Sequence, residues 1–190
     1  MLALMRNLLF GCVVAVSIAL AGRAAAFWDP ITDACQPPAI SGTARAIDGN
    51  TLVLTGQDEG QIVIRLHAID APDPAQTCRA GGEIWLCGRD ATRTLADLVD
   101  GRELACLPCG YDQAGRTLAL CRDGEADIGV GMVRAGMAMS RAFFSNALHA
   151  SEVWAQRQNL GLWRGDFVDP IAWRQGRRLG PGPCRGCVDP

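Results

Sequence analysis

The chain has 190 residues, of which 49% are hydrophobic, and this is enough for one compact domain with a core plus extra segments. All 18 basic residues are arginines, and two of them, Arg6 and Arg23, precede Phe27. The chain from Phe27 onward therefore carries 16 basic against 20 acidic residues. This balance is uninformative about nucleic acid, because a protein that coats nucleic acid is usually basic but an enzyme that only cuts it need not be.

The first 26 residues have the pattern of an export signal. One positive charge, at Arg6, precedes an apolar run over residues 8–20, and three alanines at 24–26 form a small-residue cleavage site. We expect cleavage before Phe27, release to the periplasm or the medium, and no stable membrane insertion afterwards. The alternative is an uncleaved N-terminal membrane anchor, for which the apolar run is short.

Strands dominate the first half of the region that follows. Residues 27–41 contain three prolines and predict an irregular lead-in. Strands are expected over residues 43–47 and 51–54, joined by a turn at Asp48-Gly49-Asn50, because such turn residues between β-branched segments indicate a hairpin. Alternating aliphatic residues predict a third strand over 61–66. Two glycines, Gly81-Gly82, indicate a loop over 78–87.

Helices alternate with strands in the second half. Apolar residues at helical spacing predict a helix over 88–99 that stops at Gly101. Strands are expected at 103–107 and 117–121, on either side of the turn 112–116. Asp127 is expected to cap a short helix ending at Gly136, and a third helix is expected over 148–160.

This order predicts a mainly β, α+β fold: a five-stranded OB-fold barrel with about three packed helices. We expect the domain to span residues 42–175. The tail, residues 176–190, is rich in Arg, Gly and Pro and contains a Cys-x-x-Cys unit at Cys184 and Cys187.

Eight cysteines remain once Cys12 of the signal segment is removed, and an even number in an exported chain favours disulfides. Two pairs are candidates. The first is Cys106 with Cys121, which are symmetric about the predicted hairpin turn, and the second is Cys78 with Cys87. The pairing of the other four stays open: Cys35, Cys109, Cys184 and Cys187. Zinc binding by two Cys-x-x-Cys units, Cys106 to Cys109 and Cys184 to Cys187, is an alternative, which export disfavours.

Four ordered motifs resemble the staphylococcal nuclease (thermonuclease) family over about residues 42–163. They are an Asp-Gly-x-Thr turn beginning at Asp48, an arginine at 65 followed by Asp-x-Pro-acid at 70–73, an Asp-x-x-Gly-Arg turn at 112–116, and a closing Gly-Leu-Trp at 161–163. Several motifs in family order are far more specific than any one of them.

The resemblance implies a calcium-dependent phosphodiesterase that cleaves DNA or RNA, and we expect a monomer. The calcium ligands it implies are Asn50, Asp70 and the backbone oxygen of Ala71, since calcium prefers oxygen ligands. Asp73 matches the carboxylate that handles the attacking water. The phosphate would be held by two arginines, Arg65 and Arg116, because a planar guanidinium binds phosphate oxygens in a fork.

Two acidic positions depart from the family pattern. Asn50 stands where the family has Asp, and Asp73 stands where it has Glu. The alternative function is therefore a catalytically degenerate module of the same fold that binds nucleic acid or a protein partner in the cell envelope. The same residues also have purely structural interpretations: Asp48 and Asn50 as turn formers, and Arg65 with Asp70 as an ion pair.

Overall fold

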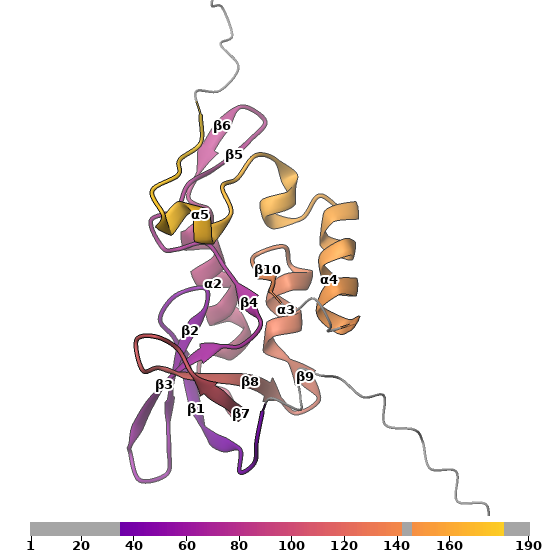
Figure 1. Cartoon of the computed structure of the whole chain (residues 1–190). Coiled ribbons are helices and arrows are strands. Elements are labelled where there is room, and N and C mark those ends of the chain that lie inside the picture. Colours follow the sequence, from indigo (N-terminus) through magenta and orange to yellow (C-terminus); the bar gives the residue numbers. More distant parts are fainter. Residues whose placement is uncertain (1–34, 142–145, 181–190) are drawn as a thin grey trace, which may run out of the picture.

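The computed structural model describes residues 35–141 and 146–180 (Figure 1). The predicted signal segment and the tail cysteines at 184 and 187 lie outside these residues. The strands are β1 Ile40–Ala46, β2 Thr51–Thr55, β3 Gln61–Leu66, β4 Ile69–Asp70, β5 Cys78–Ala80, β6 Glu83–Trp85, β7 Glu103–Tyr111, β8 Thr117–Asp123, β9 Ala126–Asp127 and β10 Met139–Ser140. The helices are α2 Cys87–Val99, α3 Ile128–Arg134, α4 Asn146–Arg157, the 3₁₀ helix η1 Gly161–Arg164, and α5 Pro170–Arg174.

Five strands form a closed barrel. The main sheet has the order β3-β2-β1-β7-β8-β9, and a parallel pairing of β3 with β8 joins its two ends. All the other strand pairs in this sheet are antiparallel. The expected OB-fold barrel with packed helices is confirmed, and closure leaves few open strand edges.

The barrel core is aliphatic. Strand β2 is buried over four successive residues, so both of its faces are covered. Among the largest fully buried side chains are Leu52, Leu54, Ile64, Leu66 and Leu104. Because these aliphatic side chains fill the barrel interior, the polar residues at the strand ends lie at the barrel rim.

Helix α2 covers one side of the barrel because its apolar residues recur every fourth position. Cys87, Ala91, Leu95 and Val99 are all completely buried, and this spacing forms one stripe along a helix. The helix ends where Gly101 takes a φ of 73°, a left-handed conformation that glycine adopts without strain.

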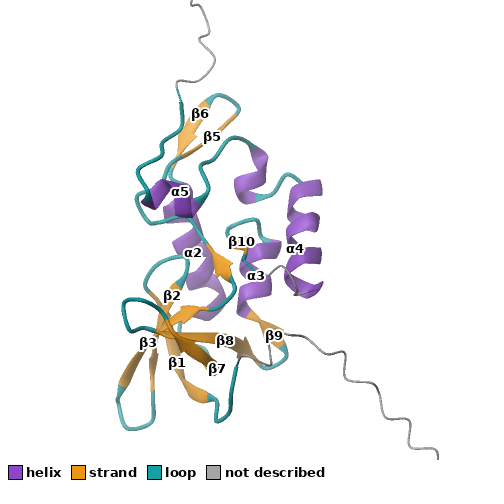
Figure 2. Cartoon of the chain, in the orientation of Figure 1, coloured by secondary structure: helices purple, strands orange, loops and turns teal. Residues whose placement is uncertain are grey.

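The remaining helices lie on the same side of the molecule as α2 (Figure 2). The side chain of Asp127 caps α3 by accepting a hydrogen bond from the Val130 N–H at 3.0 Å, as predicted. Helix α5 is capped by Asp169, with Pro170 at its first position. In Figure 1 the chain leaving α4 passes close to the β5–β6 hairpin before it forms α5.

The structure corrects the expected loop at residues 78–87. Part of it forms the two short strands β5 and β6, which pair around Gly81 and Gly82. Both glycines have positive φ, so the Gly-Gly pair that predicts a loop forms the turn of a hairpin. The third predicted helix, over residues 148–160, runs instead from Asn146 to Arg157 as α4.

Three disulfides join the described cysteines: Cys35–Cys109, Cys78–Cys87 and Cys106–Cys121. Both predicted pairs are confirmed, and the open choice for Cys35 is settled in favour of Cys109. These bonds fit an oxidising compartment. In the described part of the chain, the helices fall short of the length and apolar character that crossing a membrane requires.

Candidate active site

The candidate site lies at one rim of the barrel, where three segments meet. In the β2–β3 pairing Thr51 lies opposite Arg65, and in the parallel β3–β8 pairing Arg65 lies opposite Leu118. The β7–β8 turn therefore stands beside the end of β3. The Nη1 atom of Arg116 donates to Thr51 Oγ1 at 3.4 Å, which ties this turn to the start of β2.

An open pocket of about 510 Å³ lies at this rim. The residues that line it are Asp48, Asn50, Arg65, Asp73, Asp112, Gln113, Ala114, Arg116 and Arg174. The lining thus contains three arginines and three aspartates. The three guanidinium groups are donors of the kind that phosphate oxygens accept from, and the three carboxylates offset their formal charge.

The turn between β1 and β2 places Asn50 in the lining of the pocket. Asp48 Oδ1 accepts a hydrogen bond from the Asn50 N–H at 2.7 Å, which closes the turn. The Asn50 side chain then pairs with the main chain of Ala71 in both directions. Its Nδ2 donates to the Ala71 carbonyl at 3.0 Å, and its Oδ1 accepts from the Ala71 N–H at 2.7 Å. Asn50 is only 3% exposed, so both bonds are shielded from water.

Asp70 is 2% exposed and is surrounded by three arginines. Arg65 Nη2 reaches its Oδ1 at 3.1 Å. On the other side Arg174 Nη2 reaches its Oδ2 at 2.6 Å and Arg141 Nη2 reaches the same atom at 3.4 Å. Both carboxylate oxygens are therefore occupied, which satisfies a buried charge that would otherwise be costly.

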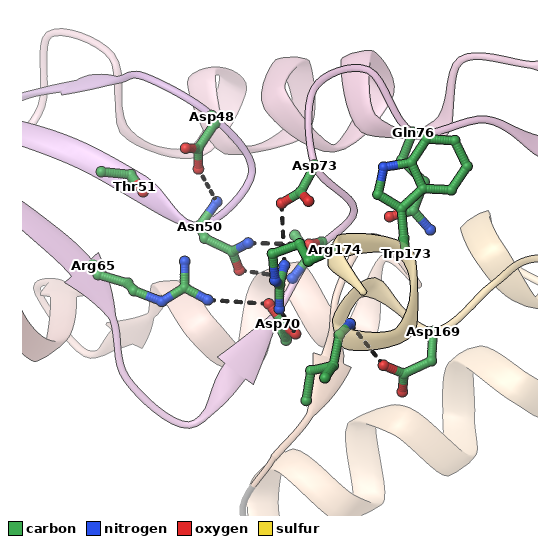
Figure 3. A network of polar contacts seen from close by, with 12 residues as sticks. Asp48, Asn50, Thr51, Arg65, Asp70, Asp73, Gln76, Asp169, Trp173 and Arg174 are labelled. Carbon is green, nitrogen blue, oxygen red and sulfur yellow. Dashed lines mark hydrogen bonds and ion pairs between the residues drawn. The ribbon is translucent and has the colours of Figure 1, made fainter. Parts of the chain in front are cut away.

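Arg174 bridges two carboxylates (Figure 3). Besides its contact with Asp70, its Nη1 donates to Asp73 Oδ1 at 3.1 Å. Burial alone would lower the pKa of Arg174, but hydrogen bonds and charge attraction from Asp70 and Asp73 outweigh it and raise that pKa. The guanidinium thus carries a full positive charge at the place where the two acids converge.

Arg116 is held by its own turn. Its Nε donates to Asp112 Oδ2 at 2.7 Å, and Asp112 Oδ1 accepts from the Arg116 N–H at 2.9 Å. Burial would raise the pKa of Asp112, but the hydrogen bonds from Arg116 and Ala114 lower it below its ordinary value. Asp112 therefore stays ionised and orients the Arg116 side chain toward the pocket rim.

Helix α5 is fixed over the site by several contacts. Arg141 Nη2 lies 2.9 Å from both carboxylate oxygens of Asp169, the α5 cap. Burial would raise the pKa of Asp169, but the Arg141 contact and the helix N–H groups lower it. The side chain of Gln76 donates to the Val168 carbonyl at 2.6 Å. Arg174 is thus presented by an anchored segment.

The structure brings the predicted metal ligands and catalytic residues to one rim, where they bond to one another and to further charged side chains. Asn50, Arg65, Asp73 and Arg116 line the pocket, and Asp70 and Ala71 are hydrogen-bonded to Arg65 and Asn50. The suggested structural roles are also present: Asp48 forms a turn, and Arg65 pairs with Asp70. The roles of these residues in binding a metal ion or in catalysis stay predictions.

Sequence reasoning missed Arg141, Asp169 and Arg174. Asp169-Pro170 was a usable signal, because an acidic cap followed by proline marks the start of a helix. Nothing local in the sequence places the side chain of Arg174 beside Asp70, 104 residues earlier.

A zinc site is not built from the described cysteines. Cys106 and Cys109 belong to two different disulfides, so neither offers a thiolate. Among the residues of the described segments, the cluster of metal-ligand type is Cys35, His67 and Cys109. Two of its members are joined in a disulfide, so neither offers a thiolate to a metal ion.

Comparison with known proteins identifies the family. Residues 63–165 match the sequence model described as "Staphylococcal nuclease homologue". A Haemophilus influenzae protein named "Uncharacterized endonuclease" is 31% identical over 136 residues, which cover 70% of this chain and 71% of the relative. With its closed barrel and an arginine- and aspartate-lined pocket at the rim, the chain belongs to the staphylococcal nuclease homologue family.

Proposed function

We propose that this protein is a nuclease that hydrolyses phosphodiester bonds in DNA or RNA. The observation that carries the proposal is the convergence of Arg65, Arg116 and Asp73 on one open pocket at the barrel rim. Two guanidinium groups can bind an anionic phosphate, and a carboxylate beside them can act on a water molecule. The endonuclease name of the Haemophilus influenzae relative supports the same assignment.

In the proposed reaction, the phosphate lies between Arg65 and Arg116. The oxygen of a water molecule forms a new bond to phosphorus while the bond from phosphorus to the leaving sugar oxygen breaks. Asp73 takes a proton from the water, and the leaving oxygen takes a proton from solvent. The two arginines stabilise the negative charge that develops on the phosphate oxygens, which is the main electrostatic contribution such a site can make.

The residues present do not fit a calcium ion in this arrangement. Calcium takes six to eight oxygen ligands in typical protein sites. Here the amide oxygen of Asn50 accepts from the Ala71 N–H, the Ala71 carbonyl accepts from the Asn50 amide, and both oxygens of Asp70 contact arginines. The family resemblance implies calcium dependence, whereas the engaged ligand atoms of this chain argue against it.

A second candidate function is a binding module without turnover. It is favoured by the pairing of each arginine with an acid: Arg116 with Asp112, Arg65 with Asp70. Such pairing reduces the net positive charge offered to a phosphate. In that case the protein would hold a nucleic acid or a protein partner in the cell envelope without cutting.

The direct test is cleavage of labelled single-stranded DNA and RNA by the protein with its disulfides formed, in calcium and in chelator. Arg65→Ala and Arg116→Ala are each expected to lower cleavage by on the order of a hundredfold, as loss of one charge-stabilising donor typically does. Arg157→Ala removes an exposed arginine at the end of α4 and serves as the matched control.

Cleavage that both arginine variants retain at the parent rate would contradict the proposal. Absence of cleavage by the folded parent in every condition, with retained binding of the oligonucleotide, would establish the binding module instead. Binding is measured on the same labelled strands by fluorescence anisotropy.

We further propose that the protein works outside the cytoplasm. Three disulfides support this, together with the signal pattern at residues 1–26. Fractionation of cells expressing the full chain tests it: recovery of an oxidised form beginning at Phe27 in the periplasm or the medium is expected. A form that keeps residues 1–26 in the membrane fraction would support the anchor.

A further inference from the structure

Resting on the proposed nuclease function, we propose that Arg174 is a further substrate-binding residue. It is the fixed cation of the site, it lies between Asp70 and Asp73, and it binds a phosphate oxygen, so that cleavage needs no divalent metal ion. Figure 3 shows its guanidinium between these two carboxylates.

The position of Arg174 is the one a bridging cation would occupy. Its two terminal nitrogens contact different acids, Asp70 at 2.6 Å and Asp73 at 3.1 Å. A guanidinium that joins two carboxylates offsets their mutual repulsion, as a metal ion does in an acidic site. Asp70 lies beneath the pocket and is 2% exposed, so an incoming ion would first have to displace Arg174 from it.

The other candidate ligands are also engaged. The amide of Asn50 and the main chain of Ala71 satisfy each other through two hydrogen bonds. A neutral amide at position 50 also supplies no formal charge, and calcium affinity follows the charge of the ligands. The neutral Asn50 therefore fits a site that holds a singly charged arginine better than a site that holds a doubly charged metal ion.

Arg174 keeps donors for substrate. A guanidinium has five N–H donors, and the contacts with Asp70 and Asp73 use one each. The side chain is 37% exposed and lines the pocket together with Arg65 and Arg116. It can therefore hold the two acids and donate to a phosphate oxygen at the same time.

The segment that carries Arg174 is fastened close to the site on both sides of α5. Before the helix, the Asp166 N–H and carbonyl exchange hydrogen bonds with the main chain of Arg79, each at 2.8 Å. After it, the Arg79 side chain donates to the Gly180 carbonyl at 2.7 Å. A preorganised arginine of this kind loses little conformational freedom when substrate binds.

The test compares the parent protein with Arg174→Ala and Arg177→Ala in the cleavage assay, in chelator and in millimolar calcium. Arg177 is exposed and lies in the same terminal segment, so it controls for the lost charge. Asp70 keeps Arg65 and Arg141 when Arg174 is removed, and circular dichroism verifies that the variant is folded.

We expect the parent to cut in chelator within about twofold of its rate in calcium, and Arg174→Ala to lose on the order of a hundredfold in chelator. Arg177→Ala should match the parent. Cleavage that requires calcium and is unchanged or faster in Arg174→Ala would overturn the inference while leaving the nuclease function in place.

If no variant cuts in any condition, the nuclease function fails and calorimetric binding of inorganic phosphate in chelator decides the role of Arg174. Weakening by about tenfold in Arg174→Ala, with no change in Arg177→Ala, assigns Arg174 to the phosphate site. Equal phosphate affinity in both variants would refute that role.

Discussion

The side chain of Asn50 and the main chain of Ala71 are joined by two hydrogen bonds, of 3.0 and 2.7 Å. The amide behaves as a peptide group would, donating to the carbonyl and accepting from the N–H of one residue. This pairing joins the β1–β2 turn to the chain just after β4 and fixes the base of the pocket.

The first prediction concerns Asn50→Asp. A carboxylate cannot donate to the Ala71 carbonyl, so two buried oxygens would face each other, and we expect the free energy of unfolding to fall by about 1–3 kcal/mol in chelator. Calcium should restore part of this loss, because the substitution adds a formal charge to an oxygen-rich site. Urea unfolding with and without calcium measures both effects.

The matched control is Asn159→Asp, which makes the same change at an exposed residue after α4. Combining Asn50→Asp with Arg174→Ala should increase the stabilisation by calcium further, since the competing guanidinium is gone. Equal unfolding free energies for the parent and Asn50→Asp would contradict the prediction.

The second prediction concerns Gly88, at the start of α2. A Cβ atom at this position would lie 1.7 Å from the Asp73 carbonyl oxygen, so the main chain that carries Asp73 must move. Misplacing a catalytic group by about 1 Å can cost on the order of a hundredfold in rate, and Gly88→Ala should lose cleavage to about that extent. The assay is the rate per folded molecule at saturating substrate.

Gly180→Ala is the control for Gly88→Ala, because a Cβ there has no neighbour within 4 Å. It adds the same methyl group and should leave the rate unchanged. A Gly88→Ala protein that cleaves at the parent rate would argue against a role for Asp73 at the reacting phosphate.

The barrel could be predicted from the sequence because its signals are local. Alternating aliphatic residues mark β3, Asp48 to Asn50 mark the first turn, and the four-residue spacing along α2 marks its buried stripe. The sequence predicts a loop where β5 and β6 form a hairpin, because three-residue strands are too short for a periodic pattern to appear.

The candidate site could be predicted only in part. The resemblance located Arg65, Asp70, Asp73 and Arg116, since these residues lie in ordered motifs. It did not indicate that Arg174, at the edge of a tail rich in Arg, Gly and Pro, reaches Asp70. That contact depends on how the chain passes the β5–β6 hairpin, and long-range packing of this kind leaves no periodic trace in the sequence.

The third prediction contrasts two disulfides. Cys78–Cys87 links the segment after Asp73 to the start of α2, whereas Cys106–Cys121 links paired residues of β7 and β8. Replacing either pair with alanine should lower the free energy of unfolding by about 2–4 kcal/mol. Only the loss of Cys78–Cys87 should also lower cleavage per folded molecule, because it frees the segment next to Asp73.

Urea unfolding measures the unfolding free energies of the two double variants. Their cleavage rates, corrected for the folded fraction, then show which disulfide affects the site. Equal corrected rates for the two double variants would show that the Cys78–Cys87 bond has no part in positioning the site.

The fourth prediction concerns His67, whose ring lies beside the Cys35–Cys109 disulfide, within 4.8 Å of its sulfurs. Burial lowers the pKa of His67 below its ordinary value of 6.5. The unfolded chain therefore takes up a proton at a higher pH than the folded protein does. Stability contributed by His67 is fully present above about pH 6.5 and is lost as the pH falls from there toward the folded-state pKa.

We expect the unfolding free energy of the parent to drop between pH 7.5 and pH 5.5, by no more than about 1.4 kcal/mol per pH unit from this one group. His67→Gln should flatten the drop because its side chain does not titrate. His149→Gln is the matched control, since His149 is exposed. Parallel pH profiles for the parent and both variants would show that burial of His67 does not couple folding to its protonation.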